Sequence, residues 1–123
     1  MVDTFFPKTF FAGNTLSDRL EKIRALLADD PDDKFLRYSL AMEHRSGNDF
    51  EAAMQQFRSL MQDDPPHVPA FFMAAQMLVE REDIEPAREL LRRGIDQARE
   101  QSDHHAAAEM SELLASLGSY GEL

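Results

Sequence analysis

The chain repeats a set of residues at a spacing of 34 positions, and this repeat constrains its fold more than any other feature. The matching pairs are Asp30 with Asp64, Pro31 with Pro65, Ala41 with Ala75, Asp49 with Asp83, Ala53 with Ala87, and Phe57 with Leu91. A spacing of roughly 20–50 residues is typical of units that cannot bury their own apolar face and therefore stack on a neighbour. Stacked repeats usually present a binding surface and not a catalytic cavity.

Apolar residues recur at intervals of three and four through most of the chain, which is the spacing of a helix face. Leu16, Leu20, Ile23 and Leu27 are one such series. The pattern predicts helices at about 16–28, 34–45, 50–62, 68–80, 85–99 and 103–117. No segment has the alternation of a strand, and the linkers contain only a few residues. The sequence therefore predicts an all-α chain of antiparallel helix pairs.

The expected ends of these helices carry typical capping residues. Thr15 or Ser17 is expected to cap the first helix, and Asp49 and Asp83 are expected to cap the third and the fifth. Gly47 is suited to the left-handed conformation that often follows a helix, so we expect it to end the second. The fifth helix lacks a closing Asp-Pro and is expected to run on to about residue 100.

Residues 34–65 and 68–99 resemble tetratricopeptide repeats, whose unit is a helix pair with small residues at fixed positions. The first copy supplies Leu40-Ala41, Asn48-Asp49-Phe50, Ala53, Phe57, Leu60 and Asp64-Pro65. The second supplies Ala74-Ala75, Asp83-Ile84, Ala87, Leu91 and Gly94. The resemblance implies a solenoid of antiparallel helix pairs, with two full repeats and flanking capping helices.

Some positions depart from the pattern of the family. Arg37 and Phe71 stand where the family has tryptophan. Ala53 and Ala87 follow the pattern, and we expect both to be buried where helices approach closely. The helix at 103–117 is expected to be a terminal cap, with Glu109 and Glu112 on its outer edge.

The chain is strongly acidic, with a net charge of −10. Such a surface repels nucleic acid and anionic lipid, so neither is expected as a partner. The charge is open to three interpretations: solubility, adaptation to high salt, or a basic partner. No run of apolar residues is long enough to span a membrane, and Met1-Val2-Asp3-Thr4 lacks the basic start of a signal peptide. A cytoplasmic location is therefore expected.

Nothing in the sequence indicates catalysis. The chain has no cysteine and no phosphate-binding glycine loop or nucleophile motif. His105 and Glu109 can face the same way on a helix, but two ligands make an incomplete metal site. His104, next to His105, points about 100° away on a helix. We therefore expect no catalytic residue, no metal and no cofactor, and the chain is not expected to be an enzyme.

The resemblance implies that the first helix of each pair lines a concave groove. The expected peptide-binding residues are Tyr38, Met42, Arg45, Phe72 and Gln76. The lysine, asparagine and arginine clamp by which some family members hold a chaperone tail is absent. One interpretation is an aromatic and methionine-rich groove for an apolar or helical peptide. The other is that Phe35, Met42 and Phe72 only fill space between helices.

The sequence divides into an aromatic tail at 1–14, a helical domain at 15–118 and a short tail at 119–123. Phe5, Phe6, Phe10 and Phe11 of the first tail either pack on the same chain, pack on a second copy or bind a partner. We expect a non-catalytic module that binds a protein or peptide in the groove. The alternative is a self-assembling structural or regulatory subunit, a homodimer formed through the same apolar surface.

Overall fold

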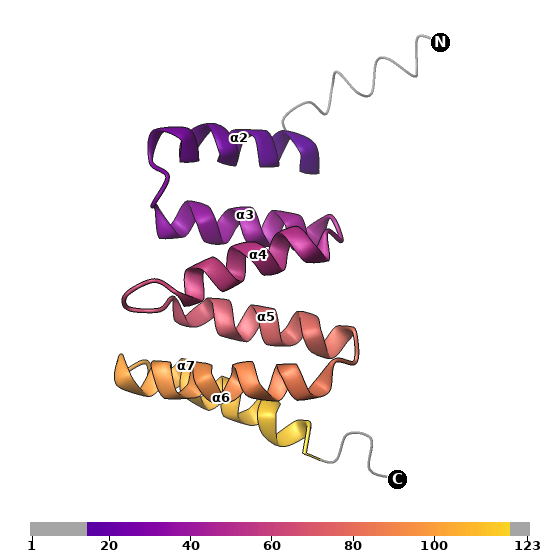
Figure 1. The fold of residues 1–123 in the computed structure, drawn as a ribbon, viewed down its shortest axis with the longest axis vertical. Helices are drawn as coiled ribbons and strands as arrows, with labels where there is room; N and C mark the ends of the chain where they lie inside the picture. The colour runs from indigo at the N-terminus through magenta and orange to yellow at the C-terminus, as the bar shows by residue number, and fades with distance from the viewer. Residues whose placement is uncertain (1–14, 119–123) are drawn as a thin grey trace. The chain divides into compact units, whose positions relative to one another are not determined.

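A computed structural model describes residues 15–118, and its regular structure in that range is entirely helical (Figure 1). The helices are α2 (Leu16–Asp29), α3 (Lys34–Ser46), α4 (Phe50–Met61), α5 (Val68–Glu80), α6 (Ile84–Glu100) and α7 (His104–Ser116). The predicted all-α fold is confirmed, as is the extension of the fifth helix to residue 100. The predicted tails at 1–14, with the four phenylalanines, and at 119–123 lie outside the described residues.

The chain divides between Gln56 and Phe57 into two compact units, so that α4 contributes residues to both. In the first unit α2 packs against α3, and Arg19 Nε donates a hydrogen bond to Glu43 Oε1 at 2.9 Å. In the second unit α6 packs against both α5 and α7, and α7 also contacts α5. Figure 1 shows α5 and α6 side by side and running in opposite directions. The second unit is therefore a three-helix cluster with α6 as its common member.

Three of the connections between helices are built in the same way. Each contains one residue in the left-handed region, namely Asn48 (φ 61°), Glu82 (φ 62°) or Ser102 (φ 61°). The aspartate that follows donates its backbone N–H to the carbonyl five residues earlier: Asp49 to His44 at 2.9 Å, Asp83 to Leu78 at 2.8 Å, and Asp103 to Ala98 at 2.7 Å. This is the hydrogen bond that closes a Schellman motif. The same aspartates stand at the N-caps of the next helices.

The prediction that Gly47 takes the left-handed position is wrong. Gly47 has φ −88°, and Asn48 is the residue with positive φ. The helix continues one residue further than the glycine suggested. Asparagine is the residue after glycine that best tolerates this conformation, because its short side chain bonds locally to the backbone. The turn is therefore of the expected kind but is shifted by one position.

Side-chain capping follows the sequence at most helix starts. Thr15, Asp33, Asp49 and Asp103 each accept a hydrogen bond from the backbone N–H three residues later, at 2.8–3.2 Å. Asp83 holds the cap position of α6, but its side chain makes no capping hydrogen bond. The reason is Pro86, which lies three residues after Asp83 and has no N–H to donate. The prediction that Asp83 caps this helix is therefore corrected: Asp83 occupies the cap position, but its side chain does not cap the helix.

Gly94 lies at the point where the three helices of the second unit meet. A Cβ atom at this position would lie 2.6 Å from Phe71 Cβ of α5 and 2.6 Å from Met110 Sδ of α7. Both of these neighbours are buried. Because the Phe71 Cβ is fixed to the α5 backbone, no rotamer change relieves such a contact. The small residue allows α5 and α7 to approach α6 closely.

The expected burial of the repeated alanines is confirmed, since Ala53 and Ala87 are both fully buried. The paired positions Phe57 and Leu91 are also fully buried. The alanine pairs and the Phe57–Leu91 pair of the 34-residue repeat therefore correspond to positions in the core. Among the described residues, none of the helices combines the length and the apolar character needed to cross a membrane.

The left-handed residue at position 82 predicts a stabilising substitution. A left-handed residue other than glycine or asparagine costs about 1–2 kcal/mol. We expect Glu82→Asn to raise the free energy of unfolding by about 0.5–1 kcal/mol, measured by urea denaturation. Glu82→Gln removes the same charge but does not favour positive φ, and it is the control. Equal stability of the two variants would contradict the explanation.

The close packing around Gly94 predicts a destabilising substitution. Gly94→Ala gains helix propensity but forces overpacking, and we expect a net loss of about 1–3 kcal/mol of unfolding free energy. Gly47→Ala is the control, because Gly47 is exposed and has an ordinary φ. Thermal unfolding of both variants checks this. A Gly94→Ala protein as stable as the wild type would show that the three helices do not need the close approach.

Candidate functional site

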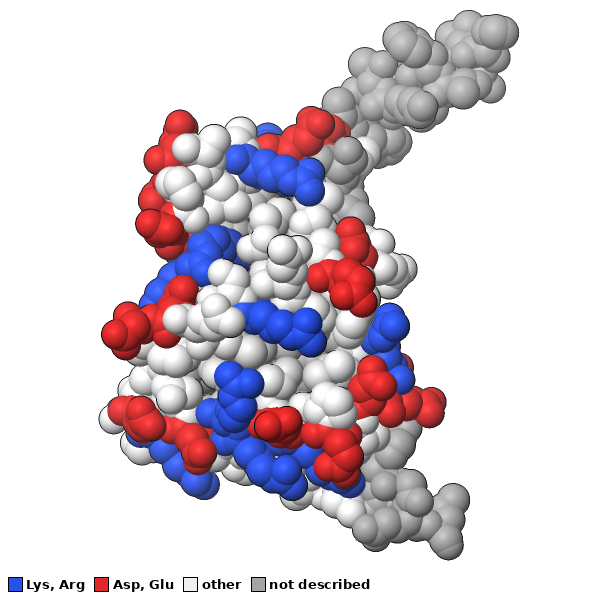
Figure 2. Space-filling view, viewed as in Figure 1, with Lys and Arg blue, Asp and Glu red and all other residues white. Residues whose placement is uncertain are grey.

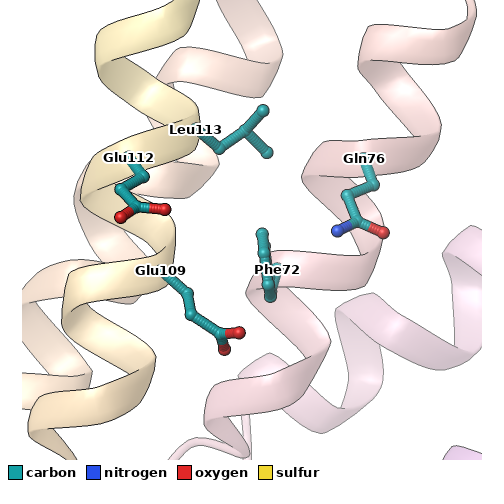
Figure 3. A pocket seen from close by; sticks show the side chains of 5 residues that line it. All are labelled: Phe72, Gln76, Glu109, Glu112 and Leu113. Atoms are coloured by element: carbon teal, nitrogen blue, oxygen red, sulfur yellow. The ribbon is translucent and has the colours of Figure 1, made fainter.

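A depression of about 320 Å³ lies between α5 and α7 in the second unit (Figure 3). Phe72 and Gln76 line it from α5, and Glu109, Glu112 and Leu113 line it from α7. Phe72 and Leu113 offer apolar surface, and the other three side chains offer an amide and two carboxylates. The depression thus combines an apolar floor with polar groups at its edge, as binding sites for peptides and small ligands commonly do.

The helix register explains why these residues face the depression. Phe72 and Gln76 are four residues apart and therefore share one face of α5. The neighbouring residues Phe71 and Ala75 are buried, which leaves Phe72 and Gln76 half-buried at the edge of the core. Glu109, Glu112 and Leu113 likewise share one face of α7. Since α7 contacts both α6 and α5, that face looks across to α5.

Glu109 and Glu112, which were expected on the outer edge of the last helix, are both exposed. Both also line the depression, and Figure 3 shows the Glu109 carboxylate on the side of α7 that faces Phe72. The three-residue connection after α6 returns α7 to the side of α5, in the place of the first helix of a following repeat. The short linker in the sequence was the signal for this.

The charges around the depression are unbalanced. α5 and α7 together carry Glu80, Glu109 and Glu112 but no lysine or arginine. α6 carries four arginines and four carboxylates, and Figure 2 shows both signs mixed over the part of the face where Figure 1 places α6. His105 Nε2 lies 3.5 Å from Glu109 Oε2, and the two form an ion pair only when the imidazole is protonated. Within the part of the chain that the structure describes, Glu112 has no ion-pair partner.

The other predicted site residues belong to α3 in the first unit. Tyr38, Met42 and Arg45 lie at intervals of four and three and therefore share one helix face. Burial raises the pKa of the Tyr38 phenol above its ordinary value of about 10, and the charge of Arg45 lowers it by a smaller amount. The effect of Arg45 on Tyr38 is consistent with their shared face. That the five residues form one concave groove stays a prediction.

The alternative that these side chains only fill the core finds no support from their exposure. Phe35 is 75% exposed, and Leu26 of α2 is 54% exposed. Met42 and Phe72 are half-buried. The core side chains of α5 are instead Val68, Ala70, Phe71, Ala74, Ala75, Met77 and Leu78. The aromatic and methionine side chains of the predicted groove thus lie at the surface or at the edge of the core.

A second depression, of about 230 Å³, lies between α6 and the connection before α5. Its lining residues are Met61, Pro66, Phe71, Arg93, Asp96, Gln97 and Glu100. The Arg93 guanidinium lies over the Phe71 ring, 5.4 Å from its centroid. Gln101 Nε2 donates to the Pro66 carbonyl at 2.9 Å and ties the connection to α6. Charges of both signs and existing internal contacts make it a weaker candidate than the depression between α5 and α7.

The geometry offers little for metal binding. Among residues 15–118, no three or more histidine, aspartate or glutamate side chains are grouped so that they could hold a metal ion. His105 and Glu109 do face together, as expected from their spacing, but only as a pair. The arrangement is suited to recognising another molecule by shape, apolar contact and charge.

A family model supports the helical repeat architecture described above. Residues 45–111, more than half of the chain, match the family model described as tetratricopeptide repeat. The matched segment includes Phe72, Gln76 and Glu109 from the depression. No curated protein and no solved structure matches the chain.

The burial of Tyr38 predicts a pH effect. Because folding raises the pKa of Tyr38, the stabilisation that the neutral phenol contributes should be fully present below pH 10. It should be lost as the pH rises from there through the pKa of Tyr38 in the folded protein. Absorbance of tyrosinate should reveal a phenol that ionises late in the folded protein and is missing from Tyr38→Phe. Circular dichroism should confirm that the protein is folded at each pH. Ionisation of Tyr38 at its ordinary pKa would contradict its burial.

Proposed function

Because the chain belongs to the tetratricopeptide repeat family, we propose that it is a non-catalytic module that binds a segment of a partner protein in the depression between α5 and α7. Repeats of this family generally mediate protein–protein interaction, and family members typically bind proteins or peptides. The depression lies on the two helices that correspond to first helices of successive repeats. Its position therefore agrees with the way in which stacked repeats present a binding surface.

The composition of the depression is the observation that carries this proposal. Phe72 and Leu113 give it apolar surface on facing helices, and the Gln76 amide can both donate and accept hydrogen bonds. Aromatic side chains that are partly buried lose little entropy when they bind, and they often dominate interfaces. A partner segment can thus bury an apolar side chain against Phe72 and Leu113 and be aligned by polar contacts at the edge.

The face of α3 formed by Tyr38, Met42 and Arg45 is a second proposed contact region, in the first unit. Tyr38 and Met42 are both half-buried, and methionine is adaptable in its contacts. We propose it as a secondary region because its three side chains come from one helix, whereas two facing helices line the depression between α5 and α7.

An alternative function is self-association into a homodimer. The observation that favours it is the exposure of Leu26 and Phe35, two large apolar side chains of the first unit. A second copy of the chain could cover them. Sedimentation equilibrium of the wild type and of Phe35→Ala distinguishes this alternative. A dimer that becomes a monomer on this substitution supports it, and a wild-type monomer rules it out.

Selection from a library of displayed peptides on the full chain tests the binding proposal. We expect peptides that bind the wild type and lose about tenfold or more in affinity for Phe72→Ala, because an aromatic anchor is commonly worth over 1 kcal/mol. Gln76→Ala should weaken binding less. Leu26→Ala is the control, since it removes an exposed apolar side chain of α2 outside both proposed contact regions. A selection without binders, or binders indifferent to Phe72→Ala in a folded variant, would overturn the proposal.

A further inference from the structure

We infer that the depression between α5 and α7 selects a partner segment that carries an arginine beside an apolar side chain. The inference rests on the proposed function, in which this depression is the binding site, and it adds the chemistry of the partner. It depends on the charge of the facing helices, on the Phe72 ring and on the apolar surface of Leu113. Each of these restricts the partner in a different way.

The carboxylates of Glu109 and Glu112 favour a positively charged group in the partner segment. Glu109 and Glu112 are three residues apart, on the same face of α7, and both side chains are exposed to solvent. In Figure 3 the Glu109 side chain extends from α7 toward Phe72 of α5, and Glu112 lies further along α7. Neither α5 nor α7 contains a lysine or arginine that could neutralise them, and His105 of α7 offsets the charge of Glu109 only when its imidazole is protonated. The depression therefore favours a cation from outside these helices and disfavours a peptide that presents a carboxylate or phosphate.

The aromatic ring distinguishes arginine from other cations. A guanidinium is planar, so it can stack on a phenylalanine ring while its N–H groups donate to carboxylates at the edge. The second unit already contains the contact between guanidinium and ring, since Arg93 lies over the ring of Phe71. Phe72 offers a half-buried ring opposite two carboxylates, with no arginine from α5 or α7 to cover it. An arginine of a partner can take that place.

The Leu113 side chain indicates that the arginine of the partner segment should have an apolar residue beside it. This side chain is half-buried and lies one residue after Glu112, so it borders the same depression. An arginine bound between Phe72 and the carboxylates brings its flanking residues next to Leu113. A leucine or a similar side chain at such a flanking position would bury apolar surface there.

Three capped pentapeptides provide the probes: N-acetyl-Ala-Leu-Arg-Leu-Ala-amide and its versions with lysine or glutamine in place of arginine. Binding to the ¹⁵N-labelled full chain is measured by chemical-shift titration. We expect the arginine peptide to shift amides near Phe72, Gln76 and residues 109–113. The lysine peptide should bind more weakly, and the glutamine peptide should bind about tenfold more weakly or worse.

The matched variants test the carboxylates. The double variant Glu109→Gln, Glu112→Gln should lose about tenfold or more in affinity for the arginine peptide. The control is Glu51→Gln, Glu89→Gln, which removes the same charge from exposed helix positions on α4 and α6. It should bind as the wild type does. Thermal melting of both variants should confirm that each is folded.

The outcomes separate this inference from the proposed function. No binding of the arginine peptide, equal binding of the arginine and glutamine peptides, or unchanged affinity of the Glu109, Glu112 double variant each overturns the inference. If library peptides without arginine bind and depend on Phe72, the proposed function stands and the inference fails. If no library peptide depends on Phe72, the proposed function itself fails.

Discussion

The close approach of three helices at Gly94 is the constraint on which the second unit depends. α6 is the common neighbour of α5 and α7, and a Cβ on residue 94 would overlap both of them. The absence of that atom brings α7 near enough to contact α5 as well. The depression exists only because these two helices face each other at that distance. A packing requirement in the core of α6 thus determines the geometry of a surface formed by its neighbours.

The short connections between helices are a further constraint on the packing. In three of them one aspartate completes the end of a helix through its N–H and holds the cap position of the next. Two helices are then joined with few residues between them, and the second has little freedom to move away from the first. Backbone hydrogen bonds suffice for this, since α6 begins normally although the Asp83 side chain has no capping bond.

Much of the fold was predictable because a repeat places the same physical demands on two sets of residues. Ala53 and Ala87 were expected in the core and lie there. The residue with positive φ at the end of α3 was less predictable. Gly47 and Asn48 both tolerate positive φ, and which of them adopts it depends on how far the helix continues. The site was predicted least well. Which face of α7 meets α5 depends on packing in three dimensions, and no periodicity within α7 reveals that Glu109 looks across to Phe72.

The unequal distribution of charge over the second unit has a kinetic consequence. The four arginines and four carboxylates of α6 largely cancel at a distance, whereas α7 carries Glu109 and Glu112 and neither α5 nor α7 carries a lysine or arginine. The resulting field extends over roughly the Debye length of about 10 Å at 0.1 M salt. A cationic segment that diffuses into this range is turned and guided before any contact forms. The rate of encounter would then slow with rising ionic strength, while the lifetime of the complex, set by contacts with Phe72 and Leu113, would change much less.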